Sequence, residues 1–462
     1  MSAIRLFKTA LIAMAALCAA PSFAENPIIQ TNFTADPAPL VHDGVVYLYT
    51  SHDEDDANGF KMLDWRLYAS TDMVNWTDKG VVASLKTFPW AVQENDAWAP
   101  QVVERGGKFY MYVPISVAGW PKNVIAVAVA DKPEGPFRDA LGKPLIDKAN
   151  GYIDPTVWVD DDGQAYLYWG NPDLWYVKLN KDMVSYSGDI TKVDSKPANY
   201  QEGPWFYKHK SKYYLAYAST CCPEGIGYVM SDKPTGPWIH NGDIMDGNPG
   251  ATGNHPGIID YKGKSYVFGF NYRLNFAETP IHHERRSVTV TELTYNPDGT
   301  IQLLPWWDGV GAKQLHTLSP YERVEAETIA WTSKVKRDRD RPIDWAPGVK
   351  PEKSDKVGMY LTRITDLTYV KVNGVDFGPS GASSFTASVA SGGKGGAIEL
   401  RLDSADGPQI GRLTVSPTAG WDDWKLQTTP VSNATGTHDL FLVFKGEGDS
   451  PLFNLDYWRF TK

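Results

Sequence analysis

The feature of this sequence that most limits its fold is a pattern that occurs five times between residues 36 and 270. Each copy has a polar or small residue, a proline, a short apolar segment, a polar turn, and a second segment rich in tyrosine or phenylalanine. The prolines stand at positions 37, 100, 155, 204 and 256, so the intervals are 63, 55, 49 and 52 residues. Repeats of about 50 residues built from paired strands are typical of β-propellers, with one repeat for each blade.

The residues just before the five first strands carry the chemistry of the pattern. In a propeller the first strand of each blade lines the central axis, so these residues are expected to converge at one mouth of the channel. They are Asp36, Ala99, Asp154, Glu202 (two residues before its proline) and His255. An Asp before Pro at one site is ordinary turn chemistry. Carboxylates at three of five equivalent positions instead predict a shared site.

Three carboxyl groups at one mouth favour glycoside hydrolysis. That reaction needs one protonated carboxyl for the leaving oxygen and one ionised carboxylate to activate water or attack the sugar. A third carboxylate nearby would raise the pKa of the proton donor by like-charge repulsion. Because the acids lie on three different blades, their separation favours the inverting reaction, which needs roughly 6.5–9.5 Å between the two carboxyls.

The N-terminal residues and the cysteines indicate an exported protein. Residues 1–24 have basic residues, an apolar run and a Ser22-Phe23-Ala24 cleavage site, which predicts a secretory signal peptide. We therefore expect the mature chain in the periplasm or outside the cell, without a membrane span. It would keep only the adjacent Cys221 and Cys222, as buried thiols or as a strained vicinal disulfide. The net charge of −10 argues against nucleic acids or anionic membranes as partners.

The chain divides into two all-β regions. Residues 26–304 carry the five repeats and are predicted to form a five-bladed β-propeller, followed by a linker at 305–320. The region 321–462 is predicted to form a β-sandwich of the jelly-roll type. It has short alternating segments separated by Gly, Ser, Pro and Asp, at 369–375, 384–390, 396–402, 410–415, 424–429 and 438–444.

The repeats also resemble a known family. ADPAP, DAWAPQV, YIDPTVWVDDDGQAYLYWG, EGPWFYK and GNHPGIID are similar to motifs of glycoside hydrolase family 43, and STCCPEGIGY and HERRSV resemble its branch of β-xylosidases and α-L-arabinofuranosidases. The resemblance implies that Asp36 is the general base and Glu202 the general acid, and that Asp154 orients the substrate and tunes the pKa of the acid. His255 resembles the histidine near a metal ion, usually calcium, on the propeller axis, with a hydrogen-bonded core histidine as the alternative.

Further positions match substrate contacts of that family. Trp98 resembles an aromatic wall of the sugar pocket, with simple core packing as the alternative. Arg285 or Arg286 resembles a substrate-binding arginine, and we favour Arg286, whose fixed donors would hold sugar hydroxyls. The acidic run at 53–56 is expected to be a solvated loop, although this run could edge the pocket.

The C-terminal region resembles carbohydrate-binding modules of family 6. Glu325 and Glu327 share one face of a strand, and Asp456 lies on the last strand. Pairing of the first and last strands would bring these three acids together as oxygen ligands for calcium, and the resemblance implies a structural calcium there. By the same resemblance Trp421 would stack on a sugar and Asn454 would bind it by hydrogen bonds. A second stacking aromatic, such as Tyr360, is left open.

These observations predict an enzyme that acts on plant cell-wall pentoses. We expect an inverting hydrolase that releases xylose or arabinose from xylan or arabinoxylan oligosaccharides, with β-xylosidase activity favoured and α-L-arabinofuranosidase activity beside it. An arabinan-degrading endo-enzyme and a non-catalytic carbohydrate-binding protein are the alternatives.

Overall fold

The computed structural model describes residues 22–119, 123–147, 151–220, 223–248, 251–307, 309–333, 349–448 and 450–462. Cys221, Cys222 and most of the predicted signal peptide lie outside the described residues, so both predictions stay predictions. Among the described helices, none is long and apolar enough to cross a membrane. The described chain is nearly all β-structure, with one short helix, α1 (Arg273–Glu278), and one 3-10 turn, η1 (Leu85–Thr87).

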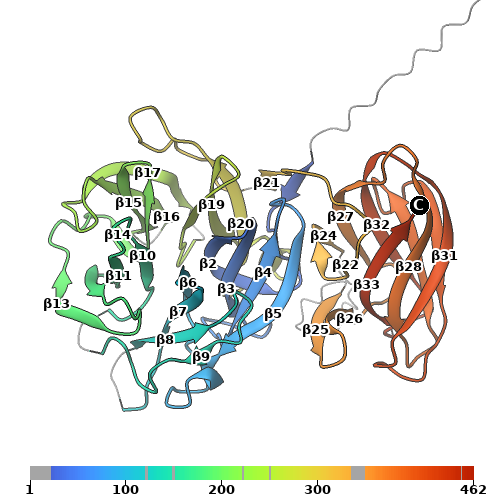
Figure 1. The fold of residues 1–462 in the computed structure, drawn as a ribbon, viewed down its shortest axis with the longest axis horizontal. Helices are drawn as coiled ribbons and strands as arrows, with labels where there is room; N and C mark the ends of the chain where they lie inside the picture. The colour runs from blue at the N-terminus through green and yellow to red at the C-terminus, as the bar shows by residue number, and fades with distance from the viewer. Residues whose placement is uncertain are drawn as a thin grey trace, which may run out of the picture.

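Five antiparallel sheets follow one another around an axis, which confirms the predicted propeller (Figure 1). Blade 1 holds β2 (Phe33–His42), β3 (Val45–Asp53), β4 (Asp64–Ser70) and β5 (Trp76–Ser84); blade 2 holds β6 (Gln101–Arg105), β7 (Lys108–Ile115), β8 (Val124–Ala130) and β9 (Arg138–Asp139); blade 3 holds β10 (Thr156–Val159), β11 (Ala165–Trp169), β12 (Trp175–Leu179) and β13 (Tyr186–Lys192); blade 4 holds β14 (Tyr200–His209), β15 (Lys212–Ser219), β16 (Glu224–Ser231) and β17 (Ile239–Asn248); blade 5 holds β18 (Gly257–Tyr261), β19 (Lys264–Asn271) and β20 (Ser287–Leu293).

Aromatic residues of the second strands fill the space between blades. Both faces of these strands are covered by neighbouring blades, so their sequences are almost entirely apolar; β11, for example, is buried at all five positions. Between blades 3 and 4, the rings of Tyr168, Phe206 and Trp238 meet edge to face, with the first two ring centroids 4.9 Å apart. Such pairs add to the free energy of burial and fix how adjacent blades meet.

The N-terminal segment closes the ring against the last blade. Ile28 donates its backbone N–H to Val288, and Thr34 donates to Arg286, so the chain before β2 runs along β20. Ahead of it, β1 (Phe23–Glu25) pairs with β21 (Val310–Lys313). The predicted signal-peptide cleavage site therefore lies inside β1, and cleavage after Ala24 would leave only the last residue of this strand.

The C-terminal region folds as a β-sandwich, as predicted (Figure 1). Its core holds the large buried side chains of Phe385, Phe444, Trp458 and Phe460. Its strands are β24 (Trp331–Thr332), β25 (Lys350–Ser354), β26 (Gly358–Thr362), β27 (Tyr369–Asp376), β28 (Ala382–Ala390), β29 (Gly396–Leu402), β30 (Gln409–Val415), β31 (Lys425–Ala434), β32 (Thr437–Lys445) and β33 (Asn454–Thr461), with the short β22 (Val324–Glu325) paired to β33.

The two regions are joined by backbone pairing as well as by side chains. Strand β23 (Thr328–Ile329) pairs with β5 and extends blade 1, and two residues later β24 enters the sandwich sheet. Asn75 of the propeller and Asn373 of the sandwich exchange hydrogen bonds of 3.0 and 2.8 Å, and Lys350 pairs with Asp55 at 2.8 Å. The propeller therefore carries the sandwich in a fixed orientation.

Candidate active site

The backbone bends sharply at or beside each acid, at an irregularity within β2 and β14 and just before β10. Asp36 and Asp154 have φ values of 50° and 59°, and the following residues are prolines. Asp tolerates this left-handed conformation better than most residues, and the turn aims its side chain at the axis. In blade 4 the same conformation falls on Gly203, at φ 58°, and the acid stands one position earlier as Glu202. This accounts for the shifted position of the acid in that repeat.

His255 lies at the centre of the three acids. Its Nδ1 is 3.3 Å from Oδ1 of Asp36, and its Nε2 is 3.7 Å from both Oδ2 of Asp154 and Oε1 of Glu202. Burial would lower the pKa of this histidine, but the charges of Asp154 and Asp36 outweigh it and raise the pKa to about 10. The imidazole is therefore a cation at neutral pH that draws the three carboxyls together.

Asp36 is held as an ionised carboxylate. The hydroxyl of Ser51 donates to Oδ2 at 2.6 Å, and Nη1 of Arg286 donates to Oδ1 at 2.9 Å. Burial alone would raise the pKa of Asp36, yet Arg286 and His255 together hold it below its usual value. A carboxylate that stays ionised and faces a cavity can accept a proton from water.

Asp154 differs from Asp36 in its protonation. Among the described residues it accepts a hydrogen bond from the backbone N–H of Gly203 at 3.1 Å. Burial, and then the negative charges of Glu202 and Asp36, raise the pKa of Asp154 to about 7, although His255 opposes this. Glu202 accepts a short hydrogen bond from the amide of Asn171. The mouth thus joins an ionised carboxylate, Asp36, with a carboxyl, Asp154, whose raised pKa lets it hold a proton near neutral pH beside Glu202.

A cavity of about 250 Å³ opens above the three acids. It is smaller than the roughly 300–1,000 Å³ of pockets for drug-sized ligands, so it suits a single sugar ring. It is lined by Asp36, Phe60, Met62, Trp98, Ala99, Ile153, Asp154, Asn171, Glu202, Gly253, His255 and Arg286. A second cavity of about 20 Å³ is lined by Asp36, Asp154 and His255 together with all five repeat prolines. The structure therefore brings the predicted acids, His255, Trp98 and Arg286 to one cavity.

The doubled arginine resolves into two different environments. Arg286 lines the cavity, whereas Arg285 donates its Nε to the backbone oxygen of Ala57 at 2.9 Å. Arg286 is 2% exposed and its guanidinium is engaged by Asp36 and Asp53. It thus supports an acid of the site as well as facing the space for a sugar.

Sequence reasoning passed over several residues of the site. Asp53 opens the acidic run that was expected to be a solvated loop, and it is fully buried against Arg286. Phe60 and Met62 form part of the cavity wall, and Asn171 holds Glu202. The one available signal for Asp53 was its place two residues after Ser51, on the same face of a strand.

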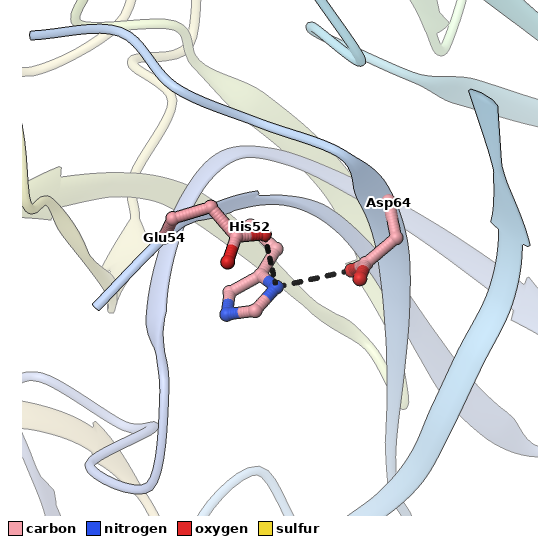
Figure 2. Close-up of side chains that lie close together, drawn as sticks. All are labelled: His52, Glu54 and Asp64. Carbon is pink, nitrogen blue, oxygen red and sulfur yellow. Dashed lines mark hydrogen bonds and ion pairs between the residues drawn. The ribbon is translucent and has the colours of Figure 1, made fainter. Parts of the chain in front are cut away.

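A second cluster of ionisable side chains lies on the other face of β3. Figure 2 shows His52 with its Nδ1 turned towards Glu54 and Asp64, at 3.7 and 3.1 Å. The three offer ligand atoms within 4.8 Å of one another. A metal-bound histidine donates its other ring N–H to an acceptor, but Nε2 of His52 is buried without a partner among the described residues. We therefore interpret the cluster as a set of polar contacts, with a hydrogen bond between His52 and Asp64, that fixes the end of β3.

The predicted calcium ligands of the sandwich do not converge. Arg323 lies between two of them, with Nη2 at 2.8 Å from Glu325 and 2.9 Å from Asp456. Glu327 is buried apart from this pair, and its Oε2 has no partner among the described residues. Calcium needs six to eight oxygen ligands around one point, so this arrangement does not fit the ion. The prediction that Glu325 and Glu327 share one face of a strand is wrong, because β22 ends at Glu325 and Glu327 lies in the turn before β23. The guanidinium of Arg323 takes the place expected for the cation.

Of the predicted sugar contacts of the sandwich, Trp421 lines a groove, whereas Asn454 and Tyr360 do not. Trp421 is 42% exposed and lines a groove of about 970 Å³. Asn454 is 5% exposed and donates its Nδ2 to the backbone oxygen of Trp421 at 2.8 Å, so it supports the loop from below. Tyr360 lies edge-on to Trp424, with ring centroids 5.3 Å apart, and does not line the groove.

Comparison with known proteins gives matches to both regions. Residues 24–301 match Glycosyl hydrolases family 43, and residues 342–462 match Carbohydrate binding module (family 6). An arabinoxylan arabinofuranohydrolase of Bacillus subtilis is 34% identical, over 95% of this chain and 92% of the relative. These matches cover the two parts of the chain on which the sequence-based resemblances rest.

Two solved structures extend the comparison. The crystal structure of a family 43 arabinoxylan arabinofuranohydrolase from Bacillus subtilis, in complex with cellotetraose, is 33% identical and has a TM-score of 0.81, over 95% of this chain and 97% of its own. A β-xylosidase/α-arabinofuranosidase from a compost microbial metagenome, in complex with xylotriose and in a calcium-free form, is 29% identical with a TM-score of 0.55, over 62% of this chain and 99% of its own.

Proposed function

The chain belongs to glycosyl hydrolase family 43 and is a glycoside hydrolase, as its motifs predicted, and we propose that it removes arabinofuranosyl side groups from arabinoxylan fragments. The observation that carries this proposal is similarity along the whole chain, sandwich included, to an arabinoxylan arabinofuranohydrolase. The cavity of about 250 Å³ supports it, because it suits one terminal sugar rather than a chain threaded through an endo-acting cleft.

The mechanism that the site supports is inversion at the anomeric carbon. Asp36, ionised beside Arg286, takes a proton from a water that attacks one face of the sugar. Glu202 gives its proton to the leaving oxygen on the other face, and Asn171 fixes the orientation of that carboxyl. Asp154 lines the same cavity and orients the sugar, while its raised pKa makes it a store for a proton beside Glu202.

Xylosidase activity is the second candidate. A solved structure that covers 62% of this chain is a β-xylosidase/α-arabinofuranosidase, and both sugars are pentoses that one small pocket can admit. The sequence alone favoured this activity. We place arabinose release first because the relative that also spans the sandwich is an arabinofuranohydrolase.

Calcium and export belong to the same proposal. His255 lines the small axial cavity, where its resemblance implies a calcium ion. Asp154, Glu202 and His255 offer ligand atoms within 4.8 Å of one another, but a protonated imidazole has no lone pair for a metal ion, so calcium would bind there only with His255 neutral. When bound, the ion would add fixed positive charge beneath the acids. The N-terminal residues support export to the periplasm or the medium, and the groove beside Trp421 supports binding of xylan-type oligosaccharides by the sandwich.

The test compares an aryl α-L-arabinofuranoside with an aryl β-D-xyloside and follows the first anomer released by NMR. We expect the arabinoside to react faster and to release β-arabinose first. A dominant xyloside rate with α-xylose first would keep the mechanism and make the protein a β-xylosidase. Retention of configuration would overturn the roles given to Asp36 and Glu202, because one acid would then be a nucleophile.

A further inference from the structure

We propose that Asp53 is a positioning residue that holds Arg286, and through it the general base Asp36, in the reacting geometry. The proposal rests on the function proposed for this mouth. It assigns a role to an acid that neither the repeat pattern nor the family motifs singled out.

The carboxylate of Asp53 accepts three hydrogen bonds from Arg286. Its Oδ1 accepts from Nη2 at 2.9 Å, and its Oδ2 accepts from Nε at 3.0 Å. The same Oδ2 accepts the backbone N–H of Arg286 at 2.8 Å. Asp53 is 0% exposed, so water does not weaken these bonds. Asp53 therefore fixes both the main chain and the guanidinium plane of Arg286.

The fixed plane decides where the remaining nitrogen points. Because a guanidinium is rigid and flat, a fork that holds Nε and Nη2 also sets the direction of Nη1. In this structure Nη1 donates to Oδ1 of Asp36 at 2.9 Å. The other oxygen of Asp36 is held by Ser51 at 2.6 Å. The orientation of the base is thus set on one side by Ser51 and on the other by Asp53 acting through Arg286.

Asp53 also prevents a competing arrangement. Arg286 is buried with two carboxylates, and a bidentate pair is a stronger contact than a single hydrogen bond. Without Asp53, the guanidinium would turn its fork onto Asp36 and take both of its oxygens. The base would then lose the oxygen lone pair that has to meet the attacking water.

The end of β3 is built to keep Asp53 in place. Ser51 and Asp53 face the axis, and His52 and Glu54 face the opposite side, where Figure 2 shows them gathered with Asp64 of β4. Side chains alternate along a strand, so contacts on one face fix the position of residues on the other. Both faces of this strand end are therefore anchored.

The first test is Asp53→Asn in the full chain, assayed on the better of the two aryl pentosides and on natural arabinoxylan fragments. We expect kcat to fall on the order of 10²-fold with KM nearly unchanged, and to fall equally on both substrates, because water must be activated in either case. Asp56→Asn is the matched control: it belongs to the same acidic run, but its partner Lys61 lies at the surface. A rise in KM with unchanged kcat would overturn the proposal, since it indicates direct contact with sugar.

The second test compares Arg286→Gln with the double variant Asp53→Asn/Arg286→Gln. If Asp53 acts through Arg286, the double variant loses no more activity than Arg286→Gln alone. It also unfolds at a higher temperature than Arg286→Gln, because Asp53 is no longer a buried charge without its partner. Losses that multiply would overturn the proposal. This comparison also serves if Asp53→Asn alone does not fold. A wild-type protein inactive on both pentosides would refute the proposed function, while the two unfolding temperatures would still test the pair.

Discussion

The propeller mouth and the side of the sandwich next to blade 1 were each predicted to bring three acids to one place, and only the mouth holds them together. At the mouth, Asp36, Asp154 and Glu202 surround His255. In the sandwich, two of the acids gather around Arg323, and Glu327 is buried away from them.

The difference lies in what each pattern fixes. Five equivalent repeats around an axis determine a direction for every residue at the same position, so residues 118 positions apart, such as Asp36 and Asp154, must meet. Alternation along a strand determines only a face. Which neighbour an acid chooses on that face then depends on competing cations, and Arg323 stands two residues before Glu325.

The largest expected loss of activity comes from replacing an acid at the propeller mouth. Glu202→Gln keeps the shape of the side chain and removes its proton, so hydrolysis of natural oligosaccharides should fall by roughly 10²–10⁴-fold. Aryl glycosides, whose leaving group hardly needs a proton, should lose far less. Parallel rate measurements on the two substrate types test this.

The matched variant at the mouth is Asp36→Ala. Water activation is needed for either leaving group, so both substrate types should suffer equally. Equal losses in Glu202→Gln, or a nearly normal Asp36→Ala enzyme, would show that the two roles are assigned wrongly.

The sequence predicted the parts of the structure that repetition and alternation determine. The propeller, the sandwich and the meeting of Asp36, Asp154, Glu202 and His255 all follow from the spacing of prolines and apolar segments. The family resemblance added the aromatic wall at Trp98.

The contacts that sequence reasoning passed over join residues with no shared pattern. Asp53 and Arg286 are 233 positions apart, and nothing in either local sequence names the other. Asn171 reaches Glu202 from a loop of the preceding blade. The family resemblance predicted that Asn454 binds sugar. In the structure its side-chain amide instead donates to the backbone oxygen of Trp421, which the motif does not show. A motif gives the residue, whereas burial and the nearest free acceptor decide its partner.

A smaller effect, on the pH dependence of stability, is expected at one buried acid in each region. Glu224, behind the loop of His255, accepts the backbone N–H of Asn254 at 2.6 Å, and its Oε1 has no partner among the described residues. Burial, with the charge of Glu202, raises its pKa from 4.5 to about 8. The unfolded chain releases this proton near pH 4.5 and the folded chain keeps it to about pH 8. Stability is therefore lost as pH rises across this range.

Glu224→Gln should remove that loss. We expect the free energy of unfolding of the variant to gain on the wild type between pH 5 and 8, by about 2–4 kcal/mol in all, measured by urea unfolding at four pH values. A difference that does not change with pH would contradict the expectation. Glu327→Gln is the counterpart in the sandwich, because burial raises the pKa of Glu327 to about 8 as well.

The smallest expected effect tests whether an arginine or a metal ion neutralises the sandwich acids. Arg323→Gln leaves the buried Asp456 without its cation, which should lower the free energy of unfolding by about 1–2 kcal/mol. Arg459→Gln, at an exposed position of the same domain, should change it little. If EDTA lowers the free energy of unfolding of the wild type, it should lower that of Glu325→Gln by the same amount. The reason is that the calcium removed by EDTA would lie on the propeller axis, away from Glu325. If Glu325→Gln were instead insensitive to EDTA, calcium would bind the sandwich acids in solution and Arg323 would have to move aside for it, which would make the two acid clusters alike after all.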